Sequence, residues 1–205
     1  MSSKNLIKKK AFFEDIYKNV IGVDEVGRGA LCGPVVSCAV ILNQNIVKKD
    51  LFIEINDSKK ININKRILLS EFIKKNSLYS FGLASNKEID NINILQATIL
   101  SMKRALYNFK NFKNKIVIDG PKIFESEKEI NFIKKGDQKS VSIAAASILA
   151  KCHRDDIMQK YSLNHPGYDW GKNKGYGTEK HINALKHLGK TNLHRESFIK
   201  NLLNN

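Results

Sequence analysis

Four acidic residues stand where the sequence predicts that strands or turns end. Asp24 and Glu25 are adjacent where the apolar run VIGV meets the glycine-bearing turn VGRG. Asp119 ends the short β-branched run KIVID, and Asp137 lies in the turn KKGDQ. Strand ends of a packed α/β sheet bring together groups from distant sequence positions, and hard divalent cations prefer carboxylate oxygens. The four acids therefore predict a site for Mg²⁺ or Mn²⁺ rather than zinc.

Each acid also has a purely structural interpretation. Asp24 could cap the glycine turn while Glu25 points to solvent. Asp119 could close a turn before Gly120, and Asp137 could lie near the N-terminus of the next helix. Four acids facing a phosphodiester need cations to neutralise them, and two ions about 4 Å apart would activate a water and stabilise the leaving oxygen. We therefore expect phosphoryl chemistry with two divalent ions if the four residues converge.

The charge balance favours a polyanionic partner. Lys and Arg number 35 against 20 Asp and Glu, which gives a formal charge of +15 and a pI near 9.7. Nucleic acid, an acidic membrane surface and an acidic protein all fit this excess. The alternative is solvated surface lysine in a chain rich in Lys, Ile and Asn. At 205 residues with 42% hydrophobic content, we expect one folded domain over residues 1–205.

Cysteine usage and hydropathy exclude several classes of protein. The spacing of Cys32, Cys38 and Cys152 indicates neither a disulfide framework nor a zinc knuckle. The first residues contain no apolar stretch of signal-peptide length, and no segment reaches the roughly 18 apolar residues of a membrane span. We therefore expect a cytoplasmic protein with no membrane partner. We also expect it to be a monomer.

The elements that position the acids can be predicted from periodicity. Residues 20–24 and 34–42 are predicted to form a hairpin, and α/β or α+β architecture with a mixed sheet follows from the alternation of later segments. Ser85 and Glu88 have capping-box spacing before a long amphipathic helix. Further strands are expected at 78–85 and 115–119 and in an edge segment at 129–138. Further helices are expected at 64–75 and 140–161, with a loop at 164–178 and a final short helix at 179–189.

A series of motifs resembles type 2 ribonuclease H, ribonuclease HII, in both content and order. They are DEVGRG at 24–29 followed by GPVV, NDSKK at 56–60, VIDG at 117–120, KGDQKSVSIAAASILAK at 135–151, RD at 154–155, KGYGT at 174–178 and HRESF at 194–198. The resemblance covers about residues 19–198. It implies an RNase H-like α/β fold, a mixed β-sheet flanked by α-helices, with a helical C-terminal segment and substrate binding by a helix and loop at about 160–200.

The resemblance also implies an activity. Members cut the RNA strand of RNA–DNA hybrids and incise duplex DNA 5′ of a single embedded ribonucleotide, leaving 3′-hydroxyl and 5′-phosphate ends. Matched residue by residue, the metal-binding and catalytic carboxylates are Asp24, Glu25, Asp119 and Asp137. The implied cofactors are two Mg²⁺ or Mn²⁺ ions. The implied partners are RNA–DNA hybrid and ribonucleotide-containing duplex DNA.

Substrate selection requires a reader of the 2′-hydroxyl, the group that separates RNA from DNA. Gly27 and Gly29 would let the backbone approach a sugar closely, although a tight turn would also need them. By resemblance, Gly27, Arg28 and Gly29 contact the ribonucleotide. Tyr176 matches the tyrosine that stacks on the next deoxyribose and so reads the RNA-to-DNA junction. Without the resemblance, Tyr176 would be interpreted as a partly buried loop anchor.

The remaining polar residues of these motifs have weaker assignments. Phosphate contacts would fix the register of a duplex, and Lys59 and Lys151 are assigned to substrate binding on that basis. Each is also interpretable as a solvated or helix-face charge, as are Lys60, Lys139 and Arg154. His194 and Arg195 receive no chemical step, because packing and salt-bridge roles explain them equally well. Cys32 is assigned only to packing.

Three alternatives bound the functional prediction. Ribonuclease HIII shares the fold but usually carries an N-terminal substrate-binding domain, and only residues 1–23 precede the acid pair. A non-catalytic nucleic-acid-binding module would gain nothing from four acids that face a polyanion. A hydrolase using Asp24 and Glu25 as acid and base is disfavoured because neighbours on a strand point to opposite faces unless a turn redirects them. No clamp-binding motif is recognised in the C-terminal IKNLLNN.

Overall fold

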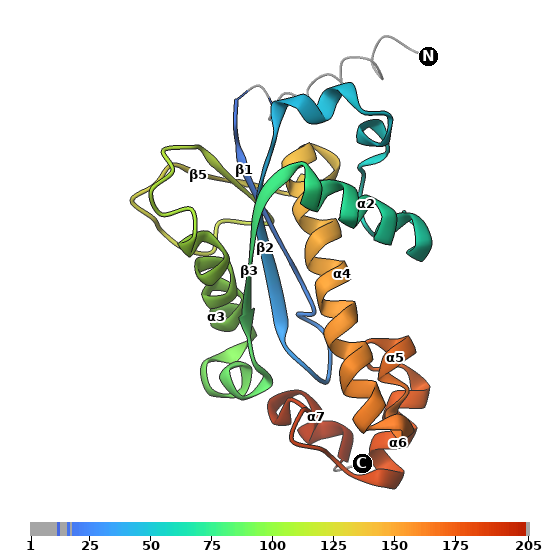
Figure 1. Cartoon of the computed structure of the whole chain (residues 1–205). Helices are drawn as coiled ribbons and strands as arrows, with labels where there is room; N and C mark the ends of the chain where they lie inside the picture. The colour runs from blue at the N-terminus through green and yellow to red at the C-terminus, as the bar shows by residue number, and fades with distance from the viewer. Residues whose placement is uncertain (1–11, 13–15, 17, 204–205) are drawn as a thin grey trace.

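A five-stranded mixed sheet lies at the centre of the structure. The computed structural model describes residues 12, 16 and 18–203. The sheet order is β3-β2-β1-β4-β5, with β1 antiparallel to β2, β2 antiparallel to β3, and β1, β4 and β5 mutually parallel (Figure 1). The predicted hairpin and mixed sheet are confirmed. The strands are β1 (Ile21–Val26), β2 (Val35–Leu42), β3 (Ser77–Ala84), β4 (Ile116–Asp119) and β5 (Ile130–Ile133).

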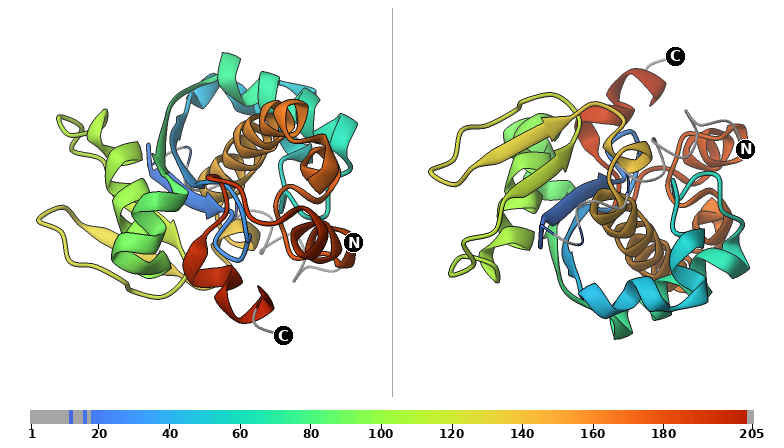
Figure 2. Two further views of the ribbon diagram at one scale, coloured as in Figure 1. Left: turned by 90° about the horizontal axis from the view of Figure 1, so that it is seen from below. Right: turned by 90° about the horizontal axis from the view of Figure 1, so that it is seen from above.

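Helices cover both faces of the sheet. Figure 2 shows α3 (Asn86–Tyr107) on one face, and α4 (Val141–Asn164) with α2 (Ile63–Lys75) on the other. The predicted capping box at the start of α3 is present, since Ser85 and Glu88 exchange hydrogen bonds. The shorter helices are η2 (Gln44–Lys48), η3 (Asp50–Glu54), η4 (Gly136–Gln138), η5 (Pro166–Tyr168), α5 (Trp170–Asn173), α6 (Glu179–Leu188) and α7 (Glu196–Leu203).

The C-terminal helices gather at one end of the molecule, beside the end of α4 (Figure 1). The expectation that the helix ending near residue 189 would be the last is wrong, because α7 follows it. The main-chain N–H groups that begin α7 donate to Asp90 of α3, Glu196 and Ser197 each at 2.9 Å. This cap comes from a distant element, so the local sequence around α7 does not contain it.

Close packing of α4 on β1 decides which way the first acid points. A Cβ on Gly22 would lie 2.2 Å from the carbonyl carbon of Ser142, so only glycine admits α4 at this distance. Side chains alternate along a strand, so Asp24 faces α4 as position 22 does, and it hydrogen-bonds Ser147 of α4. The small side chains of α4 in this core are Ala144, Ala145 and Ala146.

The loop between β1 and β2 is held between two distant segments. Isolated β-bridges pair Ala30 with Tyr176 and Cys32 with His194. Cys32 is fully buried in a cluster with Trp170, which agrees with its assignment to packing. The C-terminal segment thus completes the surroundings of the turn that follows the acid pair.

Among the described helices, none combines the length and the apolarity needed to cross a bilayer.

Candidate active site

Asp119 interacts electrostatically with each of the other three predicted acids. Strands β1 and β4 are parallel neighbours with Val23 opposite Ile118, so Asp24 and Asp119 extend from the same end of the sheet. The charge of Asp119 acts on Asp24, on Glu25 and on Asp137. Asp119 also accepts a hydrogen bond from the main-chain N–H of Gly136, which anchors the η4 turn that carries Asp137.

Burial and nearby negative charges disfavour the ionised forms of Asp24, Glu25 and Asp137. Desolvation raises the pKa of Asp24 well above its ordinary value, and the charges of Glu25 and Asp119 add to the effect. The pKa of Glu25 is also raised by burial, against which Arg28 acts from 3.3 Å. Burial raises the pKa of Asp137 as well. A bound cation would reverse this trend, because it favours every carboxylate in its ionised form.

The donor chemistry fits a hard divalent cation, although the protein alone does not form a full coordination shell. Within the described residues, no three His, Cys, Asp or Glu side chains converge closely enough to hold a metal ion. Mg²⁺ typically binds one or two carboxylates and takes waters and substrate phosphate oxygens as its other ligands. The crowded, mutually repelling carboxylates match that mode of binding, in which the substrate completes the site.

The NDSKK loop contributes an acid that sequence reasoning missed. Asp57 is 5% exposed, and its carboxylate accepts a hydrogen bond from the main-chain N–H of Lys59 at 2.9 Å. Its charge, and a hydrogen bond between the two side chains, raise the pKa of Asp137. The signal for it is the aspartate within the NDSKK motif itself. Lys59 is exposed, and its charge lowers the pKa of Asp137, which places its ammonium near that acid.

Two serines connect the same loop to the acid on β1. The hydroxyls of Ser58 and Ser147 are 2.9 Å apart, and Ser147 of α4 hydrogen-bonds Asp24. The side chain of Asp24 is therefore oriented by α4, which in turn is tied to the loop before α2. Sequence reasoning did not single out these serines, because their partners lie on three separate elements.

The GRG turn lies directly beyond the acid pair. Gly27 has φ +94°, which a side chain rarely tolerates, and a Cβ there would lie 2.2 Å from Nε of Arg154. A Cβ on Gly29 would meet no atom within 4 Å, so this side of the turn is open. Gly27 is thus required by the fold, whereas open space at Gly29 is consistent with approach of a substrate.

Arg154 is a buried structural group, so its interpretation as a solvated helix-face charge was wrong. Its guanidinium donates to the main-chain carbonyls of Pro34 at 2.9 Å, Lys174 at 2.8 Å and Cys32 at 3.1 Å. A buried charge is tolerated when its donors are all directed at acceptors. Arg154 therefore joins the start of β2 to the KGYGT loop.

Arg195 performs the corresponding role for the GRG turn. It is fully buried and donates to the carbonyls of Gly27 at 2.7 Å, Arg28 at 2.8 Å and Gly33 at 3.0 Å. Burial and the nearby charge of Arg154 lower the pKa of Arg195 to about 9. Its hydrogen-bond partners are main-chain carbonyls and not a carboxylate. Arg195 therefore holds the turn by hydrogen bonds, in place of the salt bridge considered from the sequence.

Tyr176 lies beside the same turn. Its main chain bridges Ala30, the residue after GRG, and one face of its ring lies over Arg154 at 5.4 Å from the guanidinium carbon to the ring centroid. A cation over an aromatic face stabilises the ring position. Tyr176 is only partly buried, so the structure brings a partly accessible aromatic ring next to GRG.

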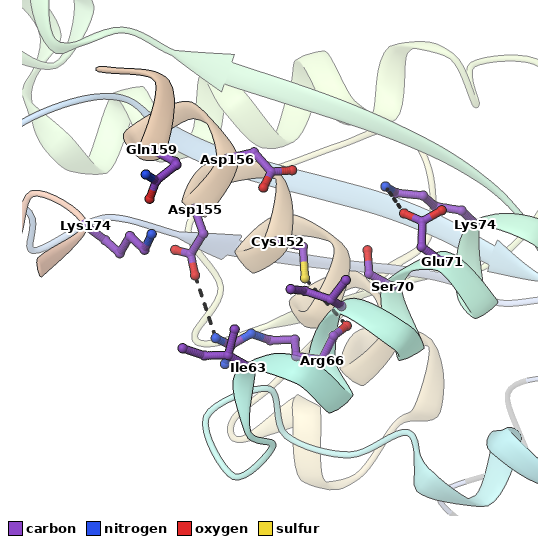
Figure 3. Close-up of a pocket in the computed structure, with 11 residues that line it drawn as sticks. Ile63, Arg66, Ser70, Glu71, Lys74, Cys152, Asp155, Asp156, Gln159 and Lys174 are labelled. Atoms are coloured by element: carbon purple, nitrogen blue, oxygen red, sulfur yellow. Dashed lines mark hydrogen bonds and ion pairs between the residues drawn. The ribbon is translucent and has the colours of Figure 1, made fainter. Parts of the chain in front are cut away.

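Lys151 lies in an ion-pair cluster on α4. Its ammonium is 2.7 Å from Asp155, which also lies 3.7 Å from a guanidinium nitrogen of Arg66. Asp155 and Arg66 line a cavity of about 220 Å³ between α2 and α4 (Figure 3). None of the four predicted acids lines this cavity. In contrast, Lys60 and Lys139 are exposed, as Lys59 is.

Comparison with known proteins gives a consistent result. Residues 21–201 match the family model described as Ribonuclease HII. A ribonuclease HII of Pelagibacter ubique is 47% identical over 182 residues, which cover 88% of this chain and 96% of that protein. A ribonuclease HII of Caldanaerobacter subterraneus is 46% identical over 197 residues, covering 95% and 80%.

Solved structures share the fold at lower identity. A ribonuclease H2 from Pyrococcus horikoshii aligns with a TM-score of 0.72 and 24% identity over 90% of this chain and 97% of that one. A chain of the PCNA:RNase HII complex from Archaeoglobus fulgidus aligns with a TM-score of 0.73 and 21% identity over 86% and 93%. Bst-RNase HIII in complex with Mn²⁺ aligns with a TM-score of 0.71 and 18% identity over 97% and 72%.

Proposed function

The chain belongs to the ribonuclease HII family and is a ribonuclease H, and from this premise we propose that it incises duplex DNA 5′ of single embedded ribonucleotides as well as cutting RNA–DNA hybrids. The observation that carries the proposal is that the acid pair and the turn assigned to ribose recognition lie next to each other in the chain. Glu25 and the GRG turn are separated by a single residue, and the turn bridges to the Tyr176 loop through Ala30. Cleavage and ribose recognition would therefore occur at one place.

The carboxylates of Asp24, Glu25, Asp119 and Asp137 would hold two divalent cations together with the scissile phosphate. Such ions neutralise phosphate charge and activate water at neutral pH. Asp24 is held by Ser147, and Asp119 is held by the N–H of Gly136, so both carboxylates are oriented before substrate arrives. The Mn²⁺ bound by the structurally similar Bst-RNase HIII supports a choice of Mg²⁺ or Mn²⁺.

Ribose recognition is assigned to the backbone of Gly27, Arg28 and Gly29. A main chain held rigidly can present N–H and C=O groups to a 2′-hydroxyl, which deoxyribose lacks. Arg195 removes freedom from this turn by occupying the carbonyls of Gly27 and Arg28. The groups left for the substrate therefore have fixed directions.

Junction reading is assigned to Tyr176. Its ring would stack on the deoxyribose that follows the ribonucleotide, on the face that Arg154 does not cover. The side chain is positioned by the bridge to Ala30, so the ribose and its neighbour would be read by adjoining parts of the chain. Lys59 and Lys151 are assigned to phosphate contacts that fix register without reading sequence.

The deciding experiment uses duplex DNA with one ribonucleotide, a long RNA–DNA hybrid and an all-DNA duplex. With Mg²⁺ or Mn²⁺ we expect the first two to be cut, the first immediately 5′ of the ribonucleotide with 3′-hydroxyl and 5′-phosphate ends. EDTA should abolish cutting, and the all-DNA duplex should stay intact. Cutting in EDTA, or no cutting with either ion, would overturn the proposal.

A further inference from the structure

Two histidines are buried together at the end of the molecule that carries the C-terminal helices. His181 of α6 is 0% exposed and His194 is 1% exposed, and their Nε2 atoms are 3.1 Å apart. Both rings pack against Tyr168 and Trp170. The hydrogen-bond partners of the two rings in the described part of the chain do not include any of the four predicted acids.

The hydrogen bonds determine the protonation of both rings. Nε2 of His181 accepts from the indole N–H of Trp170 at 2.9 Å, so its proton is on Nδ1. Nδ1 of His194 accepts from the main-chain N–H of Thr191 at 2.9 Å, so its proton is on Nε2 and is directed at Nε2 of His181, whose single lone pair it shares with the indole N–H. Both rings are therefore neutral, and burial lowers the pKa of each.

The Nδ1 proton of His181 is directed out of the cluster, towards Tyr176. Nδ1–H of His181 donates to the main-chain carbonyl of Tyr176 at 3.0 Å. The same carbonyl accepts from the N–H of Thr178 at 2.8 Å, which belongs to the turn before α6. His181 is thus the side chain that joins the Tyr176 main chain to the buried cluster.

His194 connects the cluster to the loop that follows the GRG turn. The main chain of His194 bridges Cys32, and that of Tyr176 bridges Ala30. The loop after β1 is therefore held at two points that the histidine pair connects. The ring nitrogens of both histidines have hydrogen-bond partners, which offsets the desolvation cost of burying them.

We propose that His181 is a positioning residue for Tyr176: its Nδ1–H fixes the Tyr176 carbonyl, and so sets where the aromatic ring stands relative to the GRG turn. The inference rests on the proposed function, because it takes Tyr176 as the reader of the RNA-to-DNA junction. A displaced ring would weaken cleavage at a single ribonucleotide more than cleavage within a long hybrid, where junction stacking is not required at each cut.

Two substitutions separate the contact with Tyr176 from the integrity of the cluster. His181→Gln places an acceptor near the Nε2 position, so Trp170 and His194 keep a partner while the Tyr176 carbonyl loses its side-chain donor and keeps only the N–H of Thr178. His181→Asn places a donor near the Nδ1 position, so the Tyr176 contact is kept while Trp170 and His194 lose their acceptor. His187→Gln, at an exposed position of the same helix, is the matched control.

The readout is kcat/KM on the single-ribonucleotide duplex divided by kcat/KM on the long hybrid, with the melting temperature measured alongside. We expect His181→Gln to lower this ratio about tenfold. His181→Asn should keep the wild-type ratio with a larger fall in melting temperature, and His187→Gln should change neither.

An unchanged ratio in His181→Gln, or an equal fall in His181→Asn, would overturn the role of His181. If one variant does not fold, the other decides by the same criterion. Wild-type protein that cuts neither substrate would instead contradict the proposed function, so the two failures are distinguishable.

Discussion

Arg195 donates a hydrogen bond from Nη2 to the main-chain carbonyl of Gly27 at 2.7 Å. The two residues lie near opposite ends of the sequence, yet the contact fixes the turn that follows the acid pair. The same guanidinium donates to the carbonyls of Arg28 and Gly33, so the C-terminal HRESF motif holds the GRG turn through main-chain contacts. A motif without a chemical step therefore holds the turn to which we assign ribose recognition.

Replacing Arg195 by lysine tests this contact. A single ammonium cannot span three carbonyls that a planar fork reaches together, so Arg195→Lys should lower the free energy of unfolding by about 3 kcal/mol. It should also reduce kcat/KM on a single-ribonucleotide duplex by about tenfold or more. Denaturant unfolding and cleavage kinetics measure the two effects. Arg104→Lys, at a half-exposed arginine, is the control, and wild-type recognition in Arg195→Lys would refute the assignment.

Asp119→Asn should abolish turnover while substrate binding persists. The amide oxygen can still accept from Gly136, so the η4 turn stays in place while one negative charge is removed. We expect kcat to fall by about 100-fold or more with little change in the Kd for hybrid. Single-turnover cleavage and binding in EDTA provide the measurements. Asp156→Asn, on the exposed side of α4, should behave as wild type, and an active Asp119→Asn would show that Asp119 is not a ligand.

Tyr176→Ala should impair the single-ribonucleotide substrate selectively. Loss of aromatic stacking is expected to cost about tenfold on that substrate, whereas a long hybrid should be affected less. Tyr176→Phe keeps the ring over Arg154 and should retain the preference. Steady-state kinetics on both substrates would reveal the difference. Equal losses on the two substrates would argue against junction reading.

Acid should destabilise the protein through its buried histidines. Burial and the neighbouring His181 and His165 lower the pKa of His194 from 6.5 to about 4. Between these two pH values the imidazole is protonated in the unfolded chain and neutral in the folded protein. Stability from this residue is present above pH 6.5 and falls as the pH drops towards 4. Between pH 7 and pH 5 the loss should be about 2 kcal/mol.

The pH effect of His194 can be isolated by difference. His194→Asn still accepts from Thr191 but does not titrate, so its free energy of unfolding should change less between pH 7 and pH 5 than that of wild type. The comparison cancels the carboxylates, whose raised pKa values act with the opposite sign. His187→Asn should retain the wild-type slope, and an identical slope in His194→Asn would contradict the prediction.

Much of the fold was predictable because its signals are local. The β1–β2 hairpin follows from two apolar runs around a glycine turn, and the start of α3 follows from the Ser85–Glu88 capping box. In contrast, α7 was missed because its first N–H groups are capped by Asp90 from α3. Arg154 was misjudged for the same reason, since its carbonyl partners come from two distant segments.

The sequence by itself determined which chemical groups this protein possesses: acids at strand ends, glycines in the turn beyond them and an aromatic residue in a glycine-bearing loop. Residue type and short-range spacing carry that information, because donor chemistry and turn geometry are local. Only the tertiary structure decided which groups act on one another. It joined Asp57 to Asp137, Arg195 to Gly27 and His181 to Tyr176. Such pairs depend on how separate elements pack, and the partners of a buried polar group exist only once the chain has folded.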